Sequence, residues 1–429
     1  MHDARALVQL GDEAVRRLAR KGYTLDLPAI EELLHRRNQK IALGDELRAE
    51  SKKLAASVGQ AAKSGADVSE LKIQARALKE QIADVSFQAD QAAHELSELM
   101  LTIPNMPVDE APDGFSEDDA VEVRRVGDVP DFGFEPKDHV DLGEALGILD
   151  LARATKLSGP RFSVTRAAGA KLERALAAFF LDLHTTEHGY TEFSVPNLVN
   201  TETMTGTGQL PKFEEDLFKT GVGSRELYLI PTAEVPLTNL HGDEIIDAET
   251  LPYAYTSHTP CYRSEAGSYG RDTRGILRLH QFSKVELVRI CEAETSRDEL
   301  EKMLSHAEAC LRKLGLAYRV IMLAAGDTGF NSTLTYDIEV WLPSQDKYRE
   351  ISSVSDCGQF QARRAGIRVR DKQGRKQFAA TLNGSGLPIG RTLAALLEQN
   401  QQADGSIRIP DALVPYTGFS MIKADGTPA

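Results

Sequence analysis

The chain has 429 residues, of which 41% are hydrophobic and 27% charged, and its formal net charge at pH 7 is −14. This length is enough for two or three domains, and the balance of apolar and charged residues excludes wholesale disorder. The acidic net charge argues against indiscriminate coating of nucleic acid or of anionic membrane, but it does not exclude one local basic surface.

Cysteine usage and hydropathy favour the reducing cytosol. The four cysteines, Cys261, Cys291, Cys310 and Cys357, form no CxxC pair and have no histidine at zinc-finger spacing. We therefore expect neither a disulfide scaffold nor a structural zinc site. The N-terminus lacks a continuous apolar core, so we expect no signal peptide, and no stretch approaches the ~18 consecutive apolar residues of a membrane span. These features predict a cytoplasmic protein without a membrane partner.

The first hundred residues predict two long helices. Strong helix formers dominate, and no proline occurs between Pro28 and Pro104. From Leu71 to Leu99, small or apolar residues recur at alternating spacings of 4 and 3, which is the a/d seam of a narrow two-helix contact. Residues 27–62 are the expected partner, and residues 63–67 form a short turn. We predict an antiparallel coiled-coil hairpin, with two helices of an ordinary bundle as the alternative.

The first helix of this hairpin has a local positive charge. Between Leu33 and Lys63 there are seven Lys or Arg and three Asp or Glu residues, a local excess of +4 in an acidic chain. Charge on a helix usually marks a solvated face, but this sign also suits an RNA backbone.

The composition changes after residue 105. Residues 109–122 contain seven acids and no base, which is typical of a linker or an exposed loop. We therefore divide the chain into a helical arm (1–105), an acidic linker (106–135) and a second domain (136–429). In that domain, short β-rich runs and helical stretches do not alternate as a parallel βαβ repeat would. We predict an α+β fold with an antiparallel sheet flanked by helices.

Three segments concentrate arginines, carboxylates and glycines in apolar surroundings. Residues 259–286 place four arginines in and near a glycine-containing loop, and guanidinium groups fit phosphate bidentately. Residues 381–393 combine glycines with Arg391 at the start of a helix, and residues 349–353 form a strand. Each segment alone could be a surface loop with scattered charge, so only their joint occurrence is informative.

These residues resemble the three motifs of class II aminoacyl-tRNA synthetases, and specifically those of the bacterial seryl-tRNA synthetase family. Motif one resembles residues 189–196, motif two resembles the FRSEAG-type stretch 262–267, and motif three resembles the stretch ending at Arg391. The resemblance covers nearly the whole chain, including the arm. It implies a class II catalytic domain over residues 136–429 and a tRNA-binding arm over residues 1–105.

The resemblance also implies the reaction. ATP and L-serine would give seryl-adenylate and pyrophosphate, and the seryl group would pass to tRNA(Ser) and also to tRNA(Sec). Since attack of the serine carboxylate on the α-phosphorus needs nothing covalent from the protein, positioning and electrostatics should carry catalysis. Further implied features are Mg²⁺ held by the oxygen ligands of Glu350 and Ser353, a homodimer with motif one at its interface, and tRNA recognition by shape and backbone.

For the nucleotide, the resemblance assigns catalytic roles to Arg263 at the α-phosphate and Arg391 at the γ-phosphate. It places Phe282 against adenine and Glu265 near the adenine amino group. The implied ATP site comprises Arg263, Ser264, Glu265, Arg278, Phe282, Glu350, Ile351, Ser352, Ser353 and Arg391.

For serine, a carboxylate should pair with the α-ammonium group, and buried donors and acceptors should satisfy the hydroxyl. Such sites discriminate by ~10⁴–10⁵ against an analogue that lacks the hydroxyl. The implied serine site comprises Thr232, Ala233, Glu234, Arg263, Glu286, Asn383 and Ser385. For Glu286, a salt-bridged strand carboxylate is the alternative.

Three positions, Leu334, Val354 and Gln359, depart from the family pattern. One explanation is neutral drift, and the other is a specialised second copy that tolerates a seryl-adenylate-like inhibitor or supplies seryl groups outside translation. A rival from another class is a non-catalytic, synthetase-like protein that binds RNA or an adenylate. The presence of both Arg263 and Arg391 argues against that rival.

Overall fold

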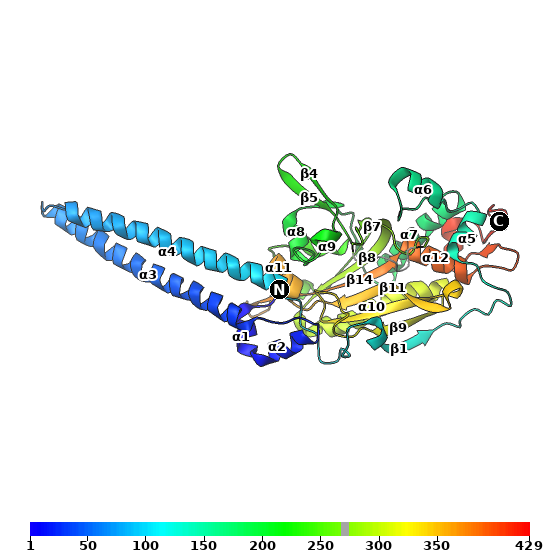
Figure 1. The fold of residues 1–429 in the computed structure, drawn as a ribbon, viewed down its shortest axis with the longest axis horizontal. Helices are drawn as coiled ribbons and strands as arrows, with labels where there is room; N and C mark the ends of the chain where they lie inside the picture. Colours follow the sequence, from blue (N-terminus) through cyan, green and yellow to red (C-terminus); the bar gives the residue numbers. More distant parts are fainter. Residues whose placement is uncertain (267–273) are drawn as a thin grey trace. The chain divides into compact units, whose positions relative to one another are not determined.

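The computed structural model describes residues 1–266 and 274–429 and divides the chain into two compact units, Met1–Pro104 and Asn105–Ala429 (Figure 1). Residues 267–273 of the predicted arginine loop, including Arg271 and the last residue of the FRSEAG-type stretch, lie outside the described residues. Among the described helices, none combines the length and the apolar character needed to cross a membrane.

The first unit consists of α1 (Ala4–Leu10), α2 (Asp12–Ala19), α3 (Leu27–Lys63) and α4 (Ser69–Thr102). Asp26 caps α3, because its carboxylate accepts a hydrogen bond from the backbone N–H of Ala29 at 3.0 Å. Arg36 of α3 pairs with Glu95 of α4, whereas Arg48 donates to Ser86 at 3.2 Å, so the two helices are antiparallel.

The a/d seam predicted for the second long helix is its buried stripe. Residues of α4 at the predicted seam positions 78, 85, 89, 92 and 96 are buried. Helix α3, whose apolar pattern is less regular, approaches α4 closely at Gly44, where a Cβ atom would lie 3.7 Å from Val85. The predicted coiled-coil hairpin is therefore confirmed.

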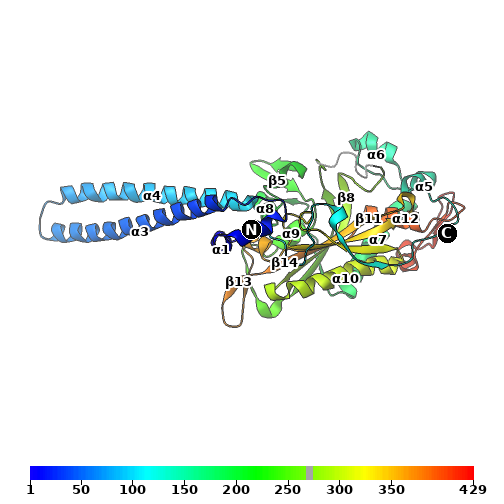
Figure 2. The same cartoon turned by 60° about the horizontal axis from the view of Figure 1, so that its bottom comes forward.

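An eight-stranded sheet forms the centre of the second unit (Figure 2). Every neighbouring pair is antiparallel except β2 and β7. This confirms the predicted α+β class. In sheet order the strands are β1 (Val121–Val126), β9 (Tyr318–Met322), β10 (Leu334–Leu342), β11 (Lys347–Asp356), β14 (Ala380–Pro388), β8 (Gln281–Cys291), β7 (Tyr253–Tyr262) and β2 (Thr191–Glu192).

Part of the segment that we predicted as an acidic linker, 106–135, is the edge strand β1. This strand pairs with β9, and the Arg124 side chain donates from Nε to the buried carboxylate of Glu308 at 3.0 Å. The sequence prediction missed the strand because its partners lie almost two hundred residues further along the chain, and because an acidic, exposed segment comes directly before it.

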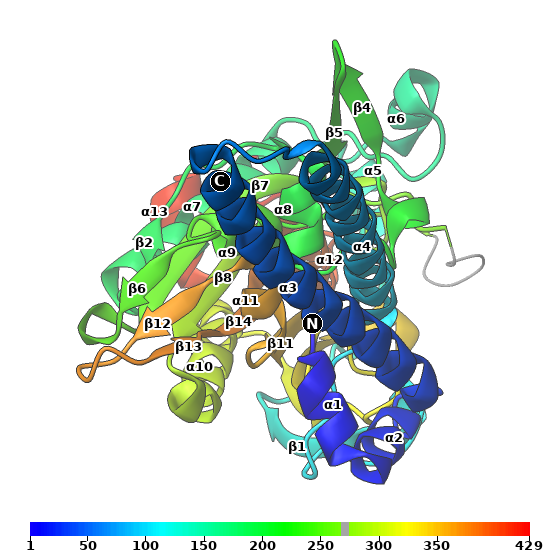
Figure 3. The same cartoon turned by 90° about the vertical axis from the view of Figure 1, so that its left-hand side faces the viewer.

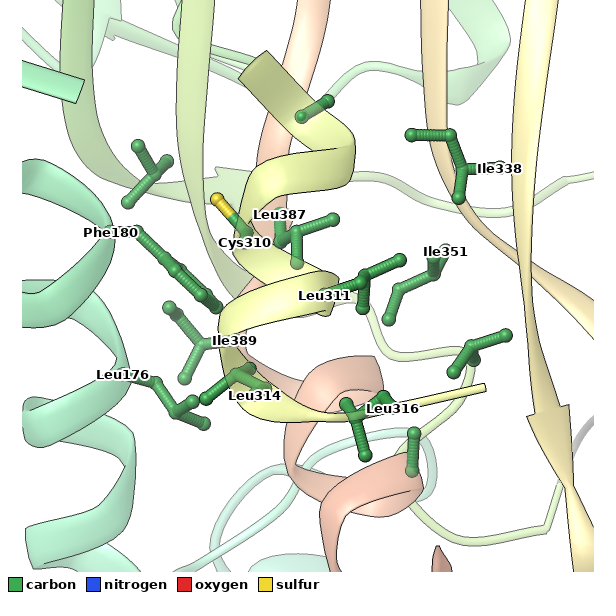
Figure 4. Packing of buried hydrophobic residues seen from close by; sticks show 14 of the residues in the cluster. Leu176, Phe180, Cys310, Leu311, Leu314, Leu316, Ile338, Ile351, Leu387 and Ile389 are labelled. Carbon is green, nitrogen blue, oxygen red and sulfur yellow. The ribbon is translucent and has the colours of Figure 1, made fainter. Parts of the chain in front are cut away.

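Apolar side chains cover one face of the sheet, and on the other face polar side chains line a cavity beside a second, smaller apolar cluster that includes Val288 and Ile290 of β8. On β8, Val285 and Leu287 point into the main core, whereas Lys284 and Glu286 line a cavity. The core is completed by α7 (Ala168–Thr186), α10 (Ser296–Leu314) and α12 (Ile389–Gln399). Figure 4 shows its packing through Leu176, Phe180, Cys310, Leu311, Leu314, Leu316, Ile338, Ile351, Leu387 and Ile389. This alternation leaves the opposite face free to form a site.

Smaller elements surround this sheet, and β6, β12 and β13 form a separate three-stranded sheet (Figure 3). The remaining helices are α5 (His139–Ala145), α6 (Leu151–Ser158), α8 (Thr201–Gly206), α9 (Glu234–Asn239), α11 (Phe360–Ala365) and α13 (Val414–Thr417). The remaining strands are β3 (Leu198–Val199), β4 (Lys219–Val222), β5 (Arg225–Leu229), β6 (Ile245–Asp247), β12 (Arg368–Arg370), β13 (Lys376–Phe378), β15 (Ile407–Arg408) and β16 (Met421–Ile422).

Candidate active site

A cavity of about 860 Å³ lies on the polar face of the central sheet. Strands β8, β10, β11 and β14 supply its floor, and the segment after β7 and the start of α12 supply parts of its wall. Most residues predicted to bind ATP or serine line this one cavity. They are Thr232, Glu234, Arg263, Glu265, Arg278, Phe282, Glu286, Glu350, Ile351, Ser353, Asn383, Ser385 and Arg391.

Three of the predicted residues lie outside the cavity lining. Ala233 is buried in a small apolar cluster, and the Ser264 hydroxyl donates to the carbonyl of Glu215 at 2.7 Å. The buried Ser352 hydroxyl donates to the carbonyl of Ser385 at 2.8 Å. In this structure these side chains contact neighbouring protein segments.

The two predicted catalytic arginines reach the cavity from distant parts of the chain. The Arg263 guanidinium donates from Nε to the carbonyl of Pro231 at 3.2 Å and lies over the ring of Phe282, 5.2 Å from its centroid. Arg391 donates from Nε to the carbonyl of Leu277 at 3.0 Å and from Nη1 to the carbonyl of Glu350 at 2.7 Å. These backbone contacts fix the direction of each guanidinium group, and a fixed guanidinium is suited to a phosphate.

The backbone of Arg263 is also held by His280, the residue just before β8. Its N–H donates to the carbonyl of His280 at 3.0 Å, and its own carbonyl lies 3.1 Å from His280 Nδ1. Beside it, Arg278 and Glu265 form an ion pair within the cavity wall. The wall therefore presents oriented cationic groups to the cavity.

Two buried carboxylates also line the cavity. Glu286 accepts a hydrogen bond from the Thr232 hydroxyl at 2.7 Å and forms an ion pair with Lys284. Glu286 is thus a salt-bridged strand carboxylate, the alternative considered above, and it also lines the cavity.

Glu234 is the second of these buried carboxylates. Its Oε1 accepts from Gln361 Nε2 at 2.7 Å and from Asn383 Nδ2 at 3.1 Å. Burial, followed by the neighbouring charge of Glu286, raises the pKa of Glu234 to about 7. A cationic ligand group would offset the free-energy cost of ionising Glu234 in this buried position, because it favours the ionised carboxylate.

The two residues predicted to hold Mg²⁺ face acidic partners on β10. The Ser353 hydroxyl donates to Asp337, and Glu350 is the register partner of Glu339. Burial and then the Glu350 charge raise the pKa of Asp337 well above its usual value. Within the described ranges, no group of three or more His, Cys, Asp or Glu side chains is arranged around a common metal position. These carboxylate and hydroxyl oxygens nevertheless fit a hard cation that keeps water or phosphate ligands.

The charged groups of the cavity lining that sequence reasoning missed include Lys284, Asp337 and Glu339. The signal was present for each, since Lys284 alternates with the predicted Phe282 and Glu286, and Asp337 alternates with Glu339 on β10. The sequence does not predict which face of β10 borders the cavity.

Comparisons with known proteins identify the family of this chain. Residues 1–107 match the family model of the seryl-tRNA synthetase N-terminal domain, and residues 218–400 match that of the tRNA synthetase class II core domain (G, H, P, S and T). A serine--tRNA ligase 2 from Streptomyces avermitilis is 60% identical over 430 residues, with 100% of both chains covered. The chain belongs to the seryl-tRNA synthetase family.

Other relatives of this seryl-tRNA synthetase family member agree. A serine--tRNA ligase from Alcanivorax borkumensis is 53% identical over 432 residues, which is 99% of this chain and 100% of the relative. The crystal structure of a Pyrococcus horikoshii seryl-tRNA synthetase complexed with ATP has a TM-score of 0.90 at 34% identity, with 100% of both chains covered. A cytoplasmic serine-tRNA ligase from Naegleria fowleri in complex with AMP has a TM-score of 0.84 at 25% identity, with 96% of both covered. The family and fold inferred from the motifs are therefore confirmed.

Proposed function

We propose that this chain activates L-serine with ATP to form seryl-adenylate and then transfers the seryl group to tRNA(Ser). The observation that carries the proposal is the convergence of Arg263, Arg391 and the carboxylates of Glu234 and Glu286 in one cavity. Family membership supports the same reaction, since the curated relatives are serine--tRNA ligases.

In this proposal, the protein acts on the first step through positioning and electrostatics. Phe282 stacks on the adenine ring, Arg263 binds the α-phosphate and the serine carboxylate, and Arg391 binds the γ-phosphate. As the serine carboxylate attacks, negative charge grows on the phosphate oxygens. Prearranged N–H donors therefore stabilise the transition state more strongly than they stabilise the ground state. Glu350 and Ser353 are the residues that would hold Mg²⁺, which supplies charge neutralisation at the phosphates when bound.

Serine selection is assigned to the buried carboxylates of the cavity. The ionised carboxylate of Glu234 binds the α-ammonium group, and the Thr232–Glu286 pair and Ser385 surround the hydroxyl. Because these buried polar groups would be left unpaired by alanine, alanine is rejected strongly, and the extra methyl group of threonine is refused by steric exclusion.

The arm and the assembly complete the proposal. The local excess of +4 between Leu33 and Lys63 supports contact between α3 and the tRNA backbone. We extend the same recognition to tRNA(Sec), and we propose a cytoplasmic homodimer with residues 189–196 at its interface.

The test is ATP–pyrophosphate exchange by the purified protein with serine, threonine, alanine or cysteine. Serine should support exchange, and alanine should be ~10⁴–10⁵-fold less efficient in kcat/KM. Absence of serine-dependent exchange, or equal exchange with alanine, would contradict the proposed function and favour a non-catalytic binding protein.

A further inference from the structure

A histidine and a glutamate form a buried pair behind the cavity wall. His139, at the start of α5, is 2% exposed, and Glu398, near the end of α12, is 0% exposed. Glu398 Oε1 lies 2.8 Å from His139 Nδ1 and accepts the backbone N–H of the same histidine at 3.1 Å. Its Oε2 accepts the backbone N–H and the hydroxyl of Ser344 at 3.2 and 2.7 Å. Four donors therefore fix the position of this carboxylate.

The other ring nitrogen of His139 determines the tautomer. The backbone N–H of Ile276 donates to His139 Nε2 at 3.3 Å. Since an amide N–H can only donate, Nε2 is the acceptor and Nδ1 carries the proton that is donated to Glu398. The His139 ring thus connects α12 to Ile276 through one defined donor and one defined acceptor.

The segment that begins at Ile276 borders the cavity. Ile276, Leu277 and Arg278 all line it, and the carbonyl of Leu277 accepts the Nε–H of Arg391. Arg391 and Glu398 lie on the same helix, so α12 holds this segment at two points: directly through Arg391 and indirectly through His139.

The two residues just before this segment, Arg274 and Gly275, pack closely against the start of α5 and against His139. Gly275 has φ of +77°, and a Cβ atom there would lie 2.2 Å from His139 Nε2. Arg274 pairs with Asp138 at 3.1 Å and with Asp141 at 2.6 Å, both at the start of α5. Glycine is therefore required at position 275 by both backbone conformation and space.

We propose that the Glu398–His139 pair is a positioning device for ATP. Through the Ile276 N–H it fixes the segment 276–278 relative to α12, and so sets the positions of Arg278 and Arg391 on the same nucleotide. The inference rests on the proposed function, and it extends the ATP site to two residues that do not touch the cavity.

Two substitutions separate the contacts of the imidazole. His139→Gln keeps an amide oxygen near the position of Nε2 and so keeps an acceptor for Ile276. His139→Asn keeps a donor to Glu398 but leaves the Ile276 N–H unpaired. In ATP–pyrophosphate exchange, His139→Asn should raise KM for ATP roughly tenfold, the effect of one buried donor without a partner, and change KM for serine less than about twofold. His139→Gln should restore most of the ATP affinity.

His241→Asn is the matched control. His241 makes the same kind of contacts, with Nδ1 at 2.7 Å from Glu244 and Nε2 at 2.8 Å from the Tyr255 hydroxyl, but neither of these partners lines the cavity, whereas Ile276 does. This variant should keep both KM values. A folded His139→Asn protein whose KM for ATP matches that of His139→Gln, or whose two KM values rise together, would overturn the positioning role.

Two further measurements keep the test decisive. If His139→Asn does not fold, Ser344→Ala provides a second test, because it removes one hydrogen-bond donor to Glu398. This variant should raise KM for ATP and leave KM for serine unchanged. An unchanged KM for ATP would overturn the proposal. Calorimetric binding of ATP to each variant reports on the same effect without turnover. Wild-type protein that binds ATP without serine-dependent exchange would contradict the proposed function, whereas equal ATP binding by all variants would contradict the positioning role.

Discussion

The carboxyl group of Glu234 shows how one residue can link burial to substrate binding. Its pKa of about 7 exceeds the ordinary value of 4.5, so the folded protein holds this proton more tightly than the unfolded chain does. Between pH 4.5 and 7, ionisation of Glu234 therefore lowers the free energy of unfolding as pH rises, and the full cost is present above pH 7. The ionised form that destabilises the fold is the one expected to bind the α-ammonium group.

We predict that KM for serine falls as pH rises through about 7 and that Glu234→Gln removes this inflection while raising KM. The physical reason is that only the ionised carboxylate attracts the ammonium group at full strength. Initial rates of exchange from pH 5.5 to 8.5 test this, and the same inflection in Glu234→Gln would assign it to another group.

Val354 is one of the three positions that depart from the family pattern, and it is fully buried in the main core. We predict that Val354→Cys changes inhibition by a non-hydrolysable seryl-adenylate analogue by less than about twofold, because the side chain packs away from the cavity. A large change in the inhibition constant would instead support the inhibitor-tolerant second copy. Leu334 is also buried in this core, and Gln359 donates to the carbonyl of Phe378 at 2.9 Å.

At the scale of elements, a buried ion pair joins α10 to β8. Arg289 Nε lies 2.5 Å from Glu299 Oε2, and both side chains are less than 10% exposed. We predict that Glu299→Ala lowers the free energy of unfolding by about 3–5 kcal/mol, because the buried guanidinium loses its counter-charge. On the same helix, Glu301→Ala should cost about 1 kcal/mol or less, since Glu301 pairs with Arg297 at an exposed position. Urea denaturation of both variants checks the difference, and equal losses would contradict it.

Strand β11 shows where prediction from sequence stops. Strict alternation would place Glu350 and Ser353, three residues apart, on opposite faces. The register pairs Glu350 with Glu339 and Ser352 with Ile338, so Ile351 is an extra residue in a β-bulge and both predicted Mg²⁺ ligands line the cavity. The motif identified the residues, but neither glycine nor proline marks the bulge, so the geometry that unites them came only from the structure.

The long helices, in contrast to the β-bulge, have a clear signal in the local sequence. The a/d seam of α4 is a local, periodic signal, so the hairpin could be read directly from spacing. Edge strand β1 depends on contacts with distant residues such as Glu308 and has no comparable local signal. Local periodicity was thus sufficient to predict the arm, and the motifs identified many of the charged residues of the site. The pairing of distant strands could be established only from the structure.

For the whole molecule, we predict that the arm and the cavity separate into two measurable activities. Changing Lys52, Lys53 and Lys63, all exposed on α3, to Glu should raise KM for tRNA(Ser) roughly tenfold or more at ~0.15 M salt, because phosphate contacts are lost. Serine-dependent ATP–pyrophosphate exchange should be unchanged, since it does not require tRNA.

A matched variant controls for net charge in this experiment. Changing three exposed basic residues of the second unit, Lys372, Arg408 and Lys423, to Glu makes the same change in charge without altering the arm. Its KM for tRNA(Ser) should stay within about threefold of wild type. Equal losses in the two variants would show that overall charge, not the arm, governs tRNA binding.

The most direct test of the proposed function is a crystal structure of the protein with L-serine, Mg²⁺ and an ATP analogue whose α–β bridging oxygen is replaced by methylene. We expect the Arg263 guanidinium to contact the α-phosphate, Arg391 to contact the γ-phosphate, and Glu234 to contact the serine ammonium group. A triphosphate bound elsewhere, or a serine ammonium group away from Glu234, would contradict it.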